Sequence, residues 1–200
     1  MAETRALDTR TMSDPRRELR IGNPGLVGTI AAVSAGAMDV FAVTGFFLGT
    51  RNLSGRSFVP SGVTFNNYGA VMATMTLGLA SLATGWAMTS LRVGNRRWAS
   101  SGFGLVVLLD FAALNLVWTV GRALGPGVRG SEYAVVSYAS MALAGIFIGI
   151  ALVTAAAGLA RVLGGQTTGT QPHLGYASAW VQHLATLAWV LSWAVIYLRK

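Results

Sequence analysis

Five apolar runs fill most of the chain after residue 25, and each is long enough to cross a lipid bilayer. They span residues 26–48, 68–91, 99–120, 133–159 and 176–198. A bilayer's hydrocarbon core is about 30 Å thick and takes roughly 20 consecutive apolar residues in helical form. Only helices and closed barrels satisfy the backbone inside lipid, and these runs lack the period-two alternation of a barrel strand. The sequence therefore predicts an all-α fold, a polytopic membrane bundle of five transmembrane helices.

The composition supports a single membrane domain over residues 25–200. The chain is 53% hydrophobic and 11% charged, whereas a soluble domain carries about 25% charged residues. Residues 1–24 have charges throughout and no apolar segment of the kind that a signal peptide needs. We expect them to form a polar cytoplasmic tail that is partly disordered.

The net charge of +8 does not indicate nucleic-acid binding, because the arginines form no single face or stripe. They lie in the tail and in the short segments between the apolar runs, where membrane topology explains them better. The chain has no cysteine, which excludes disulfides, thiolate catalysis and cysteine-ligated metals.

The distribution of basic residues predicts the orientation. One side of the membrane receives nine: Arg5, Arg10, Arg16, Arg17, Arg20, Arg92, Arg96, Arg97 and Arg161. The other side receives six: Arg51, Arg56, Arg122, Arg129, Arg199 and Lys200. Loops rich in Lys and Arg stay in the cytoplasm, so the N-terminus is predicted inside and the C-terminus outside.

Ionisable side chains interrupt three of the apolar runs: Asp39, Asp110 and His183, with Gln182 beside the histidine. Such groups are costly in lipid, so they face the bundle interior, a partner or a cavity. We favour interhelical hydrogen bonds over the alternative, a proton path or ligand site. His183 has no companion ligands for a metal, and no nucleophile–base pair appears. The chain is predicted to hold no catalytic, cofactor-binding or metal-binding residue of its own.

Two local patterns predict packing and a helix start. Small residues in the run 68–91 suggest one closely packed face, made of Gly69, Ala73, Gly78, Ala80 and Gly85. Ser131 followed by Glu132 is typical of a helix N-terminus, because the serine caps it and the carboxylate favours the positive end of the helix dipole.

The stretch YASAWVQHLATLAWVLSWAVIYLRK resembles the last helix of cytochrome c oxidase subunit III. His183 and Trp189 stand at that family's histidine and second tryptophan. Gln182 stands at its first tryptophan and Thr186 at its acidic residue. Residues 22–200 are similar, in order and in loop lengths, to the short five-helix bacterial form of the family. The supporting features are Arg96, Arg97 and Trp98 before the third run, and Ser131, Tyr133, Tyr138 and Gly149 in the fourth.

The sequence departs from the family at its intramembrane polar positions. The family's glutamate in the first of these helices falls at Gly36, with Asp39 one turn away. Its paired histidines are missing from residues 142–152, and Thr119 or apolar residues replace a late glutamate in the third run. These positions serve lipid contacts and packing against the catalytic subunit, so the chain looks like a divergent member or paralogue.

The resemblance implies a non-catalytic integral subunit of a haem–copper terminal oxidase. Haem and copper then belong to the catalytic subunit, this chain binds neither, and phospholipid is its candidate ligand. Its partners are the other oxidase subunits and membrane lipids, with no nucleic acid. The alternatives are an accessory subunit of a nitric oxide reductase, a small permease lined by Asp39, Asp110 and His183, or a membrane scaffold. We expect Asp39, Asp110, Gln182, His183 and Trp189 to serve packing or contacts with subunits and lipid.

Overall fold

The computed structural model describes residues 24–54, 58–125, 130–166 and 173–198. Five long helices make up nearly all of this part of the chain: α2 (Pro24–Ser54), α3 (Asn67–Arg92), α4 (Arg96–Ala123), α5 (Glu132–Leu163) and α6 (His173–Trp193). A π-helical turn, η4 (Ala194–Leu198), continues α6. All five helices are long and apolar enough to cross a membrane. The predicted all-α, five-span membrane bundle is confirmed; the predicted tail lies outside the described residues, except that Pro24 begins α2.

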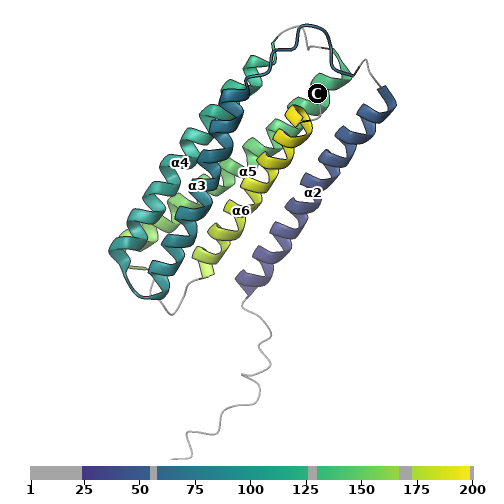
Figure 1. Ribbon diagram of the computed structural model, residues 1–200. Helices are drawn as coiled ribbons and strands as arrows, with labels where there is room; N and C mark the ends of the chain where they lie inside the picture. The colour runs from purple at the N-terminus through teal and green to yellow at the C-terminus, as the bar shows by residue number, and fades with distance from the viewer. Residues whose placement is uncertain (1–23, 55–57, 126–129, 167–172, 199–200) are drawn as a thin grey trace, which may run out of the picture.

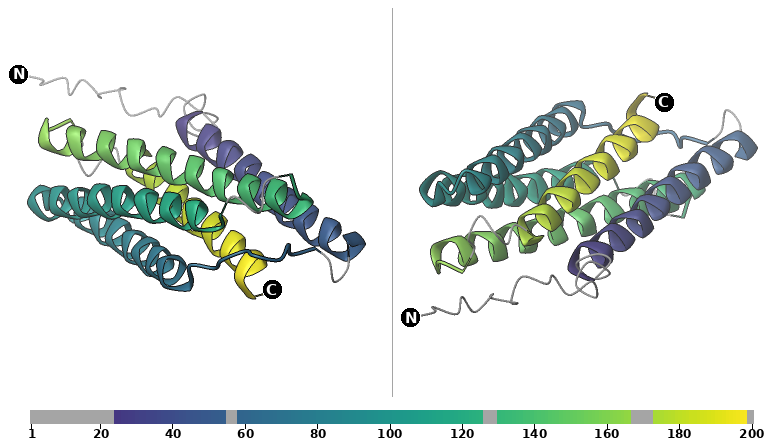
Figure 2. Two further views of the ribbon diagram at one scale, coloured as in Figure 1. Left: turned by 90° about the horizontal axis from the view of Figure 1, so that it is seen from above. Right: turned by 90° about the horizontal axis from the view of Figure 1, so that it is seen from below.

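In the bundle, α6 lies between α3 and α2, and α2 is at one edge (Figures 1 and 2). The helices α3 and α4 form a close antiparallel pair on the opposite side from α2, and α5 packs against both α4 and α6. By contrast, α2 packs mainly against α5 and α6. In an apolar stretch of eighteen residues of α2, only 17% of the residues are buried inside the bundle. The corresponding stretches of the other four helices are 33 to 44% buried.

A seven-residue spacing of small and branched side chains holds α3 and α4 together. In α4 four fully buried residues recur at this spacing: Ala99, Val106, Ala113 and Val120. In α3 six fully buried residues alternate at spacings of three and four: Ala70, Ala73, Leu77, Ala80, Thr84 and Ala87. Such a repeat places these side chains on one seam, as in a left-handed coiled coil. Inside lipid, where association depends on packing, small residues on this seam let the helices approach closely.

The small-residue face predicted for the second span is only partly correct. Gly69, Ala73 and Ala80 are buried, but Gly85 is exposed and Gly78 is half-buried. A Cβ atom at either of these two glycines would meet nothing within 4 Å. They lie off the seam because they miss its spacing, and alanines at other positions occupy it instead.

Polar caps define where three helices begin. The side-chain oxygens of Asn66, Asn95 and Ser131 accept hydrogen bonds from backbone N–H groups three residues later, at 2.8, 3.3 and 3.1 Å. The helix start predicted at Ser131 is confirmed, with Glu132 as the first helical residue.

The helices extend beyond their apolar runs, by six residues at the end of α2 and four at the end of α5. Hydropathy marks the part of a helix that lies in lipid, whereas backbone hydrogen bonding continues through polar residues outside it. In the extension of α2, the hydroxyl of Thr50 also donates to the Phe46 carbonyl at 2.9 Å. At the start of the last span, α6 begins at His173, three residues before its apolar run.

Candidate functional site

A buried polar pair joins α4 to α6 in the interior of the bundle. The amide nitrogen of Gln182 donates to the Asp110 carboxyl at 2.9 Å. Both side chains are almost completely buried, at 0% and 1% exposure. The other carboxyl oxygen of Asp110, Oδ2, and the amide oxygen of Gln182, Oε1, have no hydrogen-bond partner among the described residues. The predicted interhelical hydrogen bond therefore exists for Asp110, and its partner is the glutamine beside His183.

A row of polar side chains on α6 continues this contact toward α3. The hydroxyls of Thr186 and Ser81 lie 2.9 Å apart. One turn further along α6, the indole N–H of Trp189 donates to the Thr74 hydroxyl at 3.0 Å. Because residues 182, 186 and 189 recur at helical spacing, they form one face of α6. This face fixes the rotation and register of α6 against α3 and α4.

Asp39 and His183 lie outside this row, on the outer surface of the bundle. Both side chains are exposed. Neither forms a hydrogen bond or ion pair with any residue that the structure describes. Asp39 is the central residue of α2, with fifteen helical residues on either side. His183 is the central residue of α6, with ten on either side.

The depth of these two residues makes their exposure costly. At a rise of 1.5 Å per residue, Asp39 lies about 22 Å from either end of α2. An aspartate at the centre of a membrane helix costs about 2.5–3.5 kcal/mol, and its side chain is too short to reach the lipid–water interface. Of the three predicted placements, the bundle interior is now excluded for Asp39 and His183 within the described structure, and neither residue lines either of the two cavities described below. A partner is the placement that remains.

The three ionisable side chains also do not line a common path. Asp110 is in the interior, whereas Asp39 and His183 are on the outer surfaces of α2 and α6. No group of three or more His, Asp or Glu side chains that could hold a metal ion occurs among residues 24–54, 58–125, 130–166 and 173–198. This arrangement gives the permease alternative no support.

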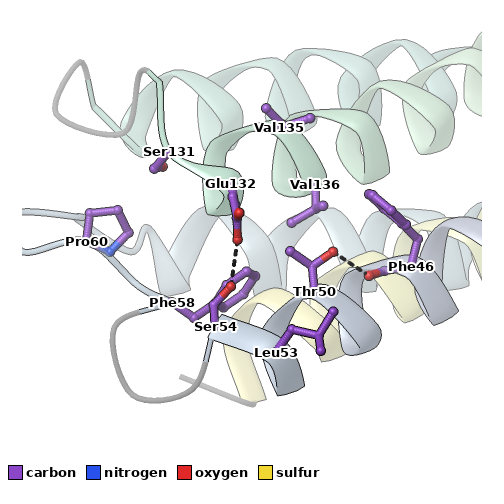
Figure 3. A pocket seen from close by; sticks show the side chains of 10 residues that line it. All are labelled: Phe46, Thr50, Leu53, Ser54, Phe58, Pro60, Ser131, Glu132, Val135 and Val136. Carbon is purple, nitrogen blue, oxygen red and sulfur yellow. Dashed lines mark hydrogen bonds between the residues drawn. The ribbon is translucent and has the colours of Figure 1, made fainter.

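A cavity of about 810 Å³ opens between the end of α2 and the start of α5 (Figure 3). At its mouth the Ser54 hydroxyl donates to the Glu132 carboxylate at 2.6 Å. Its inner wall is apolar and includes Phe58 and Val136. Phe58 belongs to an edge-to-face cluster with Phe47 and Tyr133, at centroid distances of 5.4 to 6.4 Å. The cavity combines one acidic group with an apolar wall and holds no nucleophile–base pair.

A second cavity of about 620 Å³ lies between α4 and α5. Its lining is mostly apolar and includes Trp118, Met141 and Gly145, with Arg122 and Tyr138 as its main polar residues. Arg122 is in the last turn of α4, near the end of the membrane span. A basic group beside an apolar cavity at this level suits the headgroup and acyl chain of an anionic phospholipid.

Sequence reasoning located the polar residues but missed most of their partners. Gln182 is buried against Asp110 of α4, and Trp189 is buried against α3. The sequence did not identify Thr74 as the partner of Trp189 or Ser81 as the partner of Thr186. The available signal was the helical spacing of 182, 186 and 189, which places the three residues on one face. Neither a known family model nor a curated protein matches the chain.

Proposed function

We propose that the chain is a non-catalytic integral subunit of a larger membrane complex, and that this complex is a haem–copper terminal oxidase. The observation that carries the proposal is the outward orientation of Asp39 and His183 at the centres of their helices. A free-standing bundle would leave both groups in lipid, which is unfavourable. In a complex, neighbouring subunits cover them and supply hydrogen-bond partners.

The choice of an oxidase rests on the resemblance of residues 22–200 to cytochrome c oxidase subunit III. In this proposal haem and copper are bound by the catalytic subunit, and the chain packs beside that subunit and stabilises it during aerobic electron transport. His183 occupies the family's histidine position, and here it is on the outer surface of α6. The surface around it is therefore available to another subunit or to lipid.

The packing of α2 accounts for one departure from the family pattern. Gly36 stands where the family has a glutamate, and a Cβ atom at this position would lie 2.7 Å from Leu184 Cδ2 and 2.9 Å from Phe147 Cε1. A larger side chain here requires Leu184 and Phe147 to shift, or α2 to move away from α5 and α6. The nearby acidic residue, Asp39, lies one turn further along and faces outward.

The proposed location is a bacterial cell membrane, with the N-terminus in the cytoplasm and the C-terminus outside. The excess of arginines on one set of chain segments supports this orientation. The five apolar helices support a multi-pass membrane protein.

Purification of the tagged chain from its native membranes in a mild detergent tests the proposal. We expect a haem absorption spectrum and, by mass spectrometry, a haem–copper catalytic subunit in stoichiometric amount. Recovery of the chain with no haem-bearing partner would contradict the proposal. Identification of the partner also separates an oxidase from a nitric oxide reductase.

A pair of variants on α6 provides a control within this experiment. His183→Leu removes the polar group from the outer surface, whereas Leu187→Met, one turn along the same face, keeps an exposed apolar side chain of similar size. We expect the first variant to reduce the haem recovered with the chain and the second to leave it unchanged. Equal recovery from both would show that His183 has no part in the association.

A further inference from the structure

The outer face of α2 carries a stripe of six glycines and alanines, interrupted near its middle by one methionine, with alternating spacings of three and four. We call it the α2 stripe, and its members are Gly28, Ala31, Ala35, Met38, Ala42, Gly45 and Gly49. All seven are exposed. The spacing repeats every seven residues, which is the pattern of a seam between two helices that pack with a left-handed twist. The stripe extends along most of the 31 residues of α2.

The space in front of this stripe is empty within the described structure. A Cβ atom at Gly28, Gly45 or Gly49 would meet nothing within 4 Å. Gly36, on the opposite face of the same helix, shows the contrast, because a Cβ atom there would lie 2.7 Å from Leu184. The helix therefore has two faces suited to close approach, and the bundle uses only one of them.

Asp39 adds a chemical requirement to this surface, because it directly follows Met38 of the α2 stripe. It is exposed, central in the helix and without a partner in the described structure. A carboxyl group in hydrocarbon requires a hydrogen-bond donor or a cation. Water and lipid headgroups do not extend to this depth, so the donor comes from a side chain of another membrane-spanning segment.

A second copy of this chain supplies no cation through the same stripe. In a parallel pair of α2 helices packed along the stripe, Asp39 flanks the seam and would face Ser34 of the other copy, a neutral hydroxyl that leaves the charge of the carboxylate uncompensated. Of the other polar groups on α2, the hydroxyl of Thr29 donates to the Gly25 carbonyl within its own helix. The hydroxyl of Thr44 likewise donates to the Val40 carbonyl within α2. The other exposed ionisable group at this depth, His183, lies on α6 and not on the stripe. Charge complementarity therefore favours a different protein.

We propose that the α2 stripe is the docking surface for a transmembrane helix of another protein, and that this helix carries a basic or amide side chain that pairs with Asp39. The small residues allow the two helices to approach closely, and the carboxyl group sets their depth relative to one another. The inference does not depend on the oxidase proposal, because it specifies the partner's chemistry and not its identity.

Photo-crosslinking of the full-length chain in its native membranes tests this docking surface. A benzophenone amino acid is placed at Ala35 or Ala42 in the stripe and, as a control, at Leu82 on the exposed side of α3. We expect both stripe positions to attach to a membrane-spanning peptide of one other protein, with Lys, Arg, His, Asn or Gln within two helical turns of the attachment point. The Leu82 position should not attach to that peptide.

Two substitutions then test the role of Asp39. We expect Asp39→Leu to lower the yield of this adduct roughly tenfold, and Met38→Leu, a neighbouring change that keeps an apolar side chain, to preserve it. The purified Asp39→Leu chain should melt at the same or a higher temperature than the wild type, because the carboxyl has no partner within the described chain.

Several results would overturn the inference: adducts with lipid alone, with a second copy of the chain or with the chain itself, or with a peptide that has no donor side chain. Equal adduct yields for Asp39→Leu and the wild type would also overturn it, as would a lower melting temperature for Asp39→Leu. A cross-linked partner without haem would contradict the oxidase proposal and leave this inference standing.

Discussion

The amide of Gln182 donates a 2.9 Å hydrogen bond to the carboxyl of Asp110, and so connects two helices whose residues are 72 positions apart in sequence. The pair is buried, and around it α6 also contacts α3 through hydroxyl and indole groups. In lipid, apolar side chains have little preference between the interior and the surface of a bundle. Polar contacts of this kind therefore specify which face of α6 turns inward.

Removal of either partner of this pair should destabilise the bundle. Gln182→Leu leaves the Asp110 carboxyl buried without its donor, at an expected cost of about 1–2 kcal/mol in the free energy of unfolding. Asp110→Leu should cost a similar amount, because it leaves the glutamine amide unpaired. Thermal unfolding in detergent measures both.

The double variant Asp110→Leu/Gln182→Leu should recover part of this loss, because it leaves no unpaired polar group. Asn115→Leu serves as the control, since Asn115 is on α4 but exposed. Strictly additive losses in the double variant would contradict the assigned role of the pair.

Gly102 marks a close approach of α4 to α3. A Cβ atom at this position would lie 2.8 Å from Ala87 Cβ and 2.9 Å from Ala87 Cα. Gly102→Ala should therefore destabilise the protein by about 1–3 kcal/mol, because one helix must move. Gly104→Ala, two residues later in open space, should be neutral or slightly stabilising. Unfolding in detergent compares the two, and an equal effect would contradict the close contact.

The five spans could be predicted from the sequence, but the rotation of each helix about its axis could not. A soluble helix reveals its inner face by amphipathic periodicity, whereas α2 is apolar on all sides because its outer face meets lipid. The sequence therefore predicts the positions of Asp39 and Asp110 along their helices. It does not predict that Asp39 faces outward and Asp110 inward. The pairing of Asp110 with Gln182 also depends on which helices are neighbours, which hydropathy does not encode.

Arg96 connects the beginning of α4 to the end of α5. Its guanidinium group donates to the Val162 carbonyl at 2.8 Å, at the negative end of the α5 dipole. Arg96→Gln should weaken this contact and cost about 1 kcal/mol, since the side chain is at the surface. Hydrogen exchange in the last turn of α5 should become faster. Arg97→Gln, the adjacent arginine, should leave that exchange unchanged; acceleration in both variants would point to a general charge effect.

The orientation of the bundle can be tested directly, because the chain has no cysteine and a single introduced thiol is therefore the only one. Ser61 and Val93 are exposed and lie at opposite ends of α3. In intact cells we expect a membrane-impermeant maleimide to label Ser61→Cys, which lies between α2 and α3, at the end of the bundle where the C-terminus lies. Val93→Cys, between α3 and α4, should react only after the membrane is permeabilised. The reverse pattern would place the N-terminus outside, and it would show that the nine basic residues assigned to the cytoplasmic side do not determine the topology.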